Sequence, residues 1–187
     1  MIVARRSCLL FGEAPNRAGF GRDLHVKLAA RCKNQDALWK RSAGDFLQLV
    51  KKGDPALWSW LRVTTHRNLL DYYPGERFPT KIGREVATKM WDGLVAGRPR
   101  DHLVMLAGRA VASCFQVEAD YWVPIEKDGL RIVVVPHPSG LNRYWNDLIG
   151  RQHGLDYLRA EGARLLAGSE IAQGARTPSA ARIIGPR

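Results

Sequence analysis

Residues 8–17 read CLLFGEAPNR, a short apolar run that stops at Gly12 and continues as a polar loop. A run of this length before glycine is typical of a buried strand that opens into a loop. Residues 132–143 read IVVVPHPSGLNR and repeat the arrangement, with a β-branched run that is broken at Pro136. A third apolar run, HLVMLA at residues 102–107, also predicts a buried strand.

Helical patterns lie between and after these runs. We expect one helix over residues 34–52 with Asp36 as its N-cap, a short helix that starts at Asp54-Pro55, and an amphipathic helix over residues 82–94. Another helix follows Gly108, and a long one covers about residues 142–166. Strands that alternate with helices predict a parallel sheet covered on both faces. Ligands bind beyond the carboxyl ends of such strands, so the loops at residues 12–17 and 136–143 are the candidate site.

Composition and charge narrow the class of protein. The 187 residues are 45% hydrophobic and 25% charged, which excludes wholesale disorder. Lys and Arg number 29 against 18 Asp and Glu, and the net charge of +11 favours an anionic partner, most commonly nucleic acid. No apolar run is long enough for a membrane span or a secretory signal, so we expect a cytoplasmic, nucleoid-associated protein.

The cysteines and known short motifs exclude several chemistries. Cys8, Cys32 and Cys114 are far apart and form no CxxC pair, so free structural thiols are expected rather than a zinc site, an iron–sulfur cluster or disulfides. The chain has no GxxxxGK and no HExxH motif. We expect a single domain over residues 1–167 and a basic, flexible tail over residues 168–187, which has no acid after Glu170.

Taken together and in order, the motifs resemble those of the uracil-DNA glycosylase superfamily. The first loop, GEAP at residues 12–15, is similar to the GEAPG form of its first motif, and HPS at residues 137–139 matches its second motif. The continuation GLNR at residues 140–143 is similar to the mismatch-specific branch. Residues 104–108 (VMLAG) resemble the LLG strand end, and residues 65–70 (THRNLL) resemble the TNLL segment. The resemblance covers roughly residues 7–165.

This resemblance implies a three-layer α/β/α fold with a central, mainly parallel four-stranded sheet. The chain also departs from the superfamily. It lacks the four cysteines of the iron–sulfur branch, Ala14 replaces the aspartate that holds water in the GQDPY branch, and Asn16 replaces the tyrosine that rejects 5-methyl groups.

Cleavage of an N-glycosidic bond needs a donor to the pyrimidine O2, a group that holds water beneath C1′, and a reader of the base edge. His137 is expected to supply the donor. Asn16 is expected to orient the water, and Glu13 is expected to polarise it or to anchor the sugar. Asp23 is a further candidate for the general base that activates the water. A turn role for Asn16 and a loop-shaping role for Glu13 stay open.

The remaining candidates would bind the base and the backbone of DNA. Phe20 would stack on the extruded pyrimidine. Asn68 would hydrogen-bond the edge of the pyrimidine, as the corresponding asparagine of the superfamily does. Its amide can pair with O4 and N3 of uracil or, with oxygen and nitrogen exchanged, with cytosine. Leu141, Arg143 and Tyr144 stand where the superfamily inserts a wedge. Arg143 could equally bind phosphate, and Tyr144 could equally be buried at the start of the last helix; for Trp145, burial there is expected. Phosphate contacts are expected from three further residues, Ser139, Arg17 and Arg22.

The sequence thus predicts a monofunctional DNA glycosylase that needs no metal and no organic cofactor. It would act as a monomer on DNA with uracil-like or 5-modified pyrimidines, hydroxymethyl or larger, in repair or in defence against phage with modified DNA. Two alternatives stay open: a catalytically weak protein that binds a modified base in DNA, and a basic nucleotide- or RNA-binding α/β module.

Overall fold

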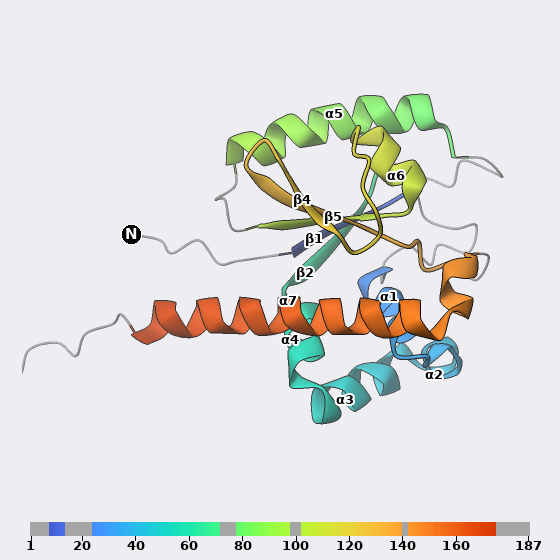
Figure 1. Ribbon diagram of the computed structural model, residues 1–187, viewed down its shortest axis with the longest axis vertical. Helices are drawn as coiled ribbons and strands as arrows, with labels where there is room; N and C mark the ends of the chain where they lie inside the picture. The colour runs from blue at the N-terminus through green and yellow to red at the C-terminus, as the bar shows by residue number, and fades with distance from the viewer. Residues whose placement is uncertain (1–7, 14–23, 72–77, 98–101, 140–141, 175–187) are drawn as a thin grey trace, which may run out of the picture.

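A computed structural model describes residues 8–13, 24–71, 78–97, 102–139 and 142–174 (Figure 1). Its centre is one five-stranded sheet in the order β2-β1-β3-β5-β4. Four strands are parallel: β1 (Cys8–Gly12), β2 (Thr64–Asn68), β3 (Leu103–Ala107) and β5 (Leu130–Val135). The predicted α/β class and mainly parallel sheet are therefore confirmed.

The predicted number of strands was wrong by one. The fifth strand, β4 (Pro124–Lys127), pairs antiparallel with β5 at one edge of the sheet. A two-residue turn, Asp128-Gly129, joins the two strands, and both residues have positive φ, as a type I′ hairpin turn requires. The sequence of β4, PIEK, contains no continuous apolar run, so its pattern did not predict a strand.

Helices cover the sheet on both faces (Figure 1). Helices α5 (Thr80–Gly97) and α6 (Arg109–Cys114) form one layer. Helices α1 (Leu24–Cys32), α4 (Pro55–Val63) and α7 (Leu148–Gly174) lie on the other side, beside α2 (Asp36–Arg41) and α3 (Ala43–Gly53). A 3₁₀ turn, η1 (Arg143–Asn146), precedes α7.

Three predicted helix boundaries are corrected. The helix expected over residues 34–52 is two helices, because Ser42 leaves the helical conformation and its side chain caps α3 by accepting from the Asp45 N–H. Asp36 is the first residue of α2, and the N-cap is Gln35. The long helix begins at Leu148 rather than near residue 142, and its backbone continues to Gly174, past the helix end expected near residue 166.

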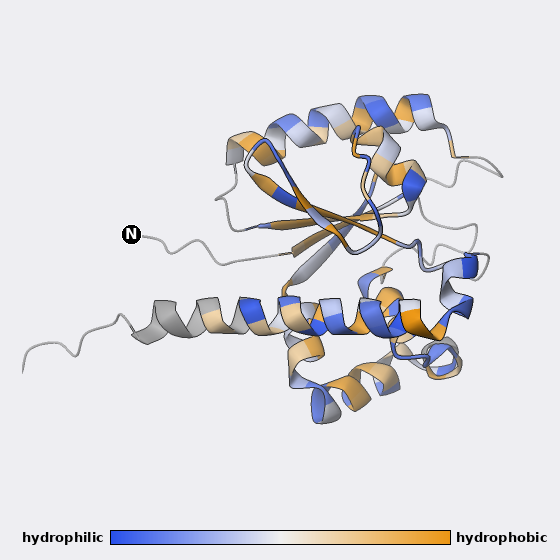
Figure 2. Cartoon of the chain, viewed as in Figure 1, coloured by the Kyte–Doolittle hydropathy of each residue, from blue (hydrophilic) through white to orange (hydrophobic). Residues whose placement is uncertain are grey.

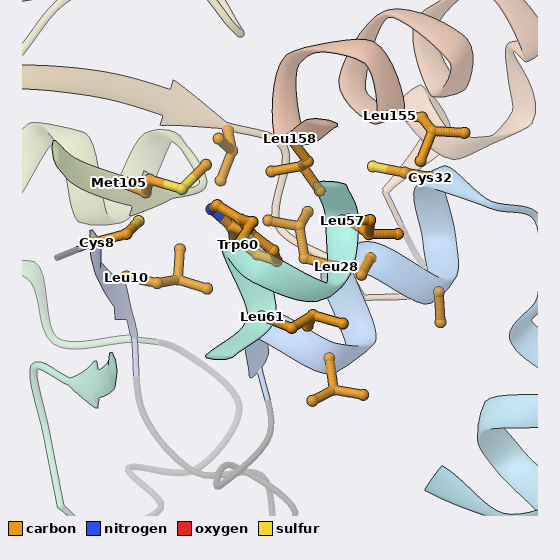
Figure 3. Close-up of a cluster of buried hydrophobic side chains, with 14 of the residues drawn as sticks. Cys8, Leu10, Leu28, Cys32, Leu57, Trp60, Leu61, Met105, Leu155 and Leu158 are labelled. Atoms are coloured by element: carbon orange, nitrogen blue, oxygen red, sulfur yellow. The ribbon is translucent and has the colours of Figure 1, made fainter. Parts of the chain in front are cut away.

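Each face of the sheet has its own apolar core, because alternate strand residues point to opposite sides. Cys8 and Leu10 face α1, α4 and α7, whereas Leu9 and Phe11 face α5 and α6. Trp60 of α4 is fully buried at the centre of the first core, which Figure 3 shows in close-up. Figure 2 shows mostly apolar colouring along the inner strands and a mixture of polar and apolar residues along the helices.

Helices α4 and α7 pack without a gap at one point. A Cβ added to Gly162 would lie 1.8 Å from the carbonyl oxygen of Ala56, so only glycine permits this approach.

Two buried carboxylates lie close to this contact and are paired with cations. Glu161 pairs with Arg131 and Arg164, and Asp54 pairs with Lys33 and Arg159. Burial alone would raise the pKa of Asp54, but hydrogen bonds from these cations and from a backbone N–H lower it on balance.

The three cysteines are buried free thiols, as predicted. Among the described residues, no helix is long and apolar enough to cross a membrane.

Candidate functional site

The carboxyl ends of the parallel strands bring the two sequence motifs to one edge of the sheet. Gly12 ends β1 and pairs with Asn68 at the end of β2. Glu13 follows Gly12, and its carbonyl accepts a hydrogen bond of 3.0 Å from the Leu70 N–H, which fixes the start of the first loop beside β2. His137 follows the end of β5, two residues after Val135. Strand β3 lies between β1 and β5 in the sheet; it ends at Ala107, and Gly108 follows it directly.

Glu13 and His137 both lie next to Gly108. A Cβ built on Gly108 would lie 3.1 Å from the Cβ of His137 and 3.7 Å from Oε1 of Glu13. The backbone of Gly108 has φ 96° and ψ 157°, a region that is essentially restricted to glycine. Its N–H also donates to the Val135 carbonyl at 2.8 Å, which locks β3 to β5 immediately before the second loop. The missing side chain therefore lets a carboxyl group and an imidazole approach the same point.

The backbone of His137 is anchored by the segment that follows it. Its carbonyl accepts from Nε1 of buried Trp145 at 2.8 Å and from Nδ2 of Asn142 at 3.2 Å. Asn142 also accepts from the Tyr144 N–H at 3.0 Å and so caps the 3₁₀ turn. The burial predicted for Trp145 is confirmed, and this buried indole holds the second motif in place.

The imidazole of His137 is neutral at physiological pH. Burial, and next the positive charge of Lys27, lower its pKa from 6.5 to about 4. A neutral imidazole has one N–H donor and one acceptor nitrogen. The ring can therefore donate a hydrogen bond to a developing oxyanion without carrying a proton that it must first lose.

Lys27 is a site residue that the sequence did not suggest. It lies on α1, which follows the first loop, and one turn later Arg31 of the same helix donates to the Pro138 carbonyl at 3.4 Å. This side of α1 therefore faces the second motif. Lys27 belongs to none of the sequence motifs, and the helix α1 was not predicted. No sequence signal therefore pointed to Lys27.

The carboxyl group of Glu13 is partly buried, and this burial raises its pKa above the ordinary value of 4.5. Its Oε1 lies near Gly108, which His137 also approaches. A carboxylate here can hold a water molecule or stabilise positive charge on a sugar.

Asn68 lies at the far side of the same edge. Its Oδ1 is 2.9 Å from Nε2 of His66, and a Cβ added to Gly12 would lie 2.7 Å from that oxygen. The amide therefore sits over the end of β1, within the group of strand ends that also positions Glu13. His66 was not among the predicted site residues, although it precedes Asn68 by two positions in the strand.

The remaining predicted residues divide into three groups. Arg143 is exposed, and Ser139, whose carbonyl accepts from the Asn142 N–H at 3.3 Å, is half-buried. Tyr144 is held in the packing: its hydroxyl accepts from Trp122 Nε1 at 2.9 Å and donates to the Gly150 carbonyl at 3.0 Å. The other candidates lie outside the described residues: Asn16, Arg17, Phe20, Arg22, Asp23 and Leu141.

A separate open groove of about 1010 Å³ includes none of Glu13, Asn68 and His137. It lies along α5, α6 and the segment after α6, and it is lined by Arg84, Arg109, Ser113 and residues 116–120. Within the described ranges, no group of three His, Cys, Asp or Glu side chains could hold a metal ion.

A scan of the chain against protein-family models finds no match, and a search of curated proteins finds none either. Support for a function therefore comes from the site itself: a carboxyl group, a neutral imidazole and an amide at the carboxyl ends of three parallel strands, β1, β5 and β2, of one sheet.

Proposed function

We propose that the protein is a monofunctional DNA glycosylase with a sheet of the uracil-DNA glycosylase type, which hydrolytically excises uracil-like or 5-modified pyrimidines. One observation carries the proposal: Glu13 and His137, from two motifs more than a hundred residues apart, both lie within 4 Å of the position that a Cβ on Gly108 would occupy. The order β2-β1-β3-β5 of the parallel strands supports the same type of sheet.

The reaction breaks the bond between C1′ of the sugar and N1 of the base. The bonding electron pair leaves with the base, so negative charge gathers on its O2 while positive charge gathers on the sugar. The N–H of neutral His137 would donate to O2, and the carboxylate of Glu13 would stabilise the sugar cation or polarise the attacking water. The water oxygen bonds to C1′ and one of its protons neutralises the base, which leaves an abasic site.

The same site accounts for reading the base and binding DNA. The amide of Asn68 lies at the β2 end of the edge and would contact the base edge. Exposed Arg143 and the half-buried Ser139 follow the second motif and would contact phosphates, in keeping with the net charge of +11. Asn16 stands where a tyrosine would exclude 5-substituents, which favours a pocket for hydroxymethyl or larger groups.

The test is a panel of duplexes that each carry one pyrimidine: uracil, thymine, 5-hydroxymethyluracil or 5-hydroxymethylcytosine. After incubation, alkali-labile breaks at the modified position report an abasic site. We expect the wild type to produce breaks, His137→Ala and Glu13→Gln to be strongly impaired, and the matched surface variants His153→Ala and Glu85→Gln to behave as wild type.

Two results would overturn the proposal. A protein that shifts the duplexes in a gel but leaves every one of them alkali-resistant would be a binder of modified DNA. A protein that neither cuts nor binds these duplexes would point to the nucleotide- or RNA-binding class.

A further inference from the structure

We infer that His66 is a positioning residue that fixes the amide of Asn68, so that the site distinguishes 4-oxo pyrimidines from 4-amino pyrimidines. The inference rests on the proposed glycosylase function and adds a determinant of which base the site accepts. The observation behind it is the contact of 2.9 Å between Nε2 of His66 and Oδ1 of Asn68.

The contact defines the two ends of the amide. His66 and Asn68 are two positions apart in β2, so their side chains project from the same face of the sheet. A carbonyl oxygen can only accept, so Nε2 of His66 donates and carries a proton. The oxygen of Asn68 is therefore the end held by His66, and the NH₂ group is the end left for other partners.

Gly12 of β1 shows in which direction the oxygen lies. A Cβ on Gly12 would be 2.7 Å from Oδ1 of Asn68 and 3.5 Å from Nε2 of His66, so both atoms lie over the end of the neighbouring strand. In the strand order, β1 separates β2 from β3 and β5, and His137 follows β5. The amide oxygen thus lies on the side of Asn68 nearer to His137.

A pyrimidine whose O2 meets His137 extends N3 and then position 4 toward β2. The oxygen of Asn68 then faces N3, and its NH₂ group faces position 4. In a 4-oxo base, N3–H donates to the amide oxygen and O4 accepts from the NH₂ group; the oxygen has a second lone pair for His66. In a 4-amino base, N3 is an acceptor that faces the acceptor oxygen of Asn68, and the amino group is a donor that faces the donor NH₂ group. Both contacts are therefore mismatched.

Without the donor of His66, a rotation of 180° about the last side-chain bond of Asn68 would exchange oxygen and nitrogen. The amide could then match either class of base. Loss of the contact should therefore reduce discrimination at position 4 rather than lower the two excision rates in parallel, as a merely structural role would.

The experiment compares two duplexes that differ only at position 4, one with 5-hydroxymethyluracil and one with 5-hydroxymethylcytosine. Single-turnover excision rates are measured for the wild type, for His66→Phe, which removes the donor, and for His66→Gln, which restores an N–H. The control Thr65→Val changes the neighbouring, exposed strand residue. We expect the wild type to prefer the 4-oxo base, His66→Phe to reduce the ratio about three- to tenfold, and His66→Gln and Thr65→Val to retain most of it.

A wild type that prefers the 4-amino base, or an unchanged ratio in His66→Phe, would overturn the inference while the glycosylase function stands. Excision of no base by the wild type would overturn the proposed function and this inference with it. A second measurement needs no activity: proton–nitrogen correlation spectra of the imidazole should show His66 protonated at Nε2. A proton found on Nδ1 alone would also overturn the inference.

Discussion

Replacing Gly108 by alanine tests whether the position directly after β3 must lack a side chain for the site to form. The backbone of Gly108, at φ 96° and ψ 157°, lies in a region that costs other residues about 1–3 kcal/mol. The new methyl group would also stand 3.1 Å from the Cβ of His137, closer than ordinary van der Waals contact. We therefore expect Gly108→Ala to lower the free energy of unfolding by about 1–3 kcal/mol.

The same substitution should damage catalysis beyond its effect on stability. Relief of the contact moves His137 by a few tenths of an ångström, and a displacement of roughly 1 Å in an active site can cost about 10²-fold in rate. We expect about a tenfold loss in single-turnover excision, measured at a temperature where the variant is fully folded.

The control is Gly93→Ala in α5, where an added Cβ meets nothing within 4 Å. Alanine favours a helix interior over glycine by about 1 kcal/mol, so this variant should be slightly more stable and equally active. Urea unfolding and the excision assay, run side by side, give both quantities. Wild-type stability and rate in Gly108→Ala would refute the reasoning about this position.

His137→Ala should reduce excision by roughly 10²–10³ with little change in DNA affinity, as expected for loss of one oxyanion donor; near-normal turnover would contradict the role of His137. Because burial depresses the pKa of His137 to about 4, the unfolded chain binds more protons than the folded one between pH 6.5 and 4. The free energy of unfolding of the wild type should thus be unchanged above pH 6.5 and should fall by up to about 3 kcal/mol by pH 4. His137→Gln should lack this loss, and parallel pH profiles of the two proteins would disprove the burial of a neutral ring. Gly162→Ala should lower the free energy of unfolding by roughly 1–3 kcal/mol or more, because the methyl group meets the Ala56 carbonyl, and an unchanged urea midpoint would contradict that contact. DNA affinity in a titration should fall by roughly 10³ or more between roughly 50 and 200 mM salt if about six phosphates are contacted, whereas a flat response would assign the positive charge another purpose.

The buried parts of the fold were readable from the sequence because burial leaves a simple pattern. Strands β1, β3 and β5 are covered on both faces, so their residues form continuous apolar runs. Edge strands lack this signal. β2 reads TTHRN and β4 reads PIEK, and their partners in the sheet, rather than their own hydrophobicity, make them strands.

Helix boundaries were harder to predict for a related reason. Apolar spacing continues from α2 into α3, and only the cap formed by Ser42 separates them. The helix α1 follows a loop and buries Val26, Leu28, Ala29 and Ala30, two of which are small residues that give little periodic signal.

For the site, the motifs located Glu13, Asn68 and His137, and the parallel topology explains how they come to one edge. The contributions of Lys27 and His66 depend on tertiary contacts between α1 and the second loop and within β2. Lys27 belongs to none of the motifs, and His66 lies within the THRNLL segment at residues 65–70, where the resemblance assigned a role to Asn68 alone.

The most direct test of the central claim measures both products of the reaction from a duplex with one 5-hydroxymethyluracil. Mass spectrometry quantifies the free base, and alkaline cleavage quantifies the abasic site. The account predicts that the wild type yields the two in equal amounts and that the double variant Glu13→Gln/His137→Ala yields neither while it still binds DNA. Equal yields from the double variant and the wild type would contradict the claim that these two residues form the active site.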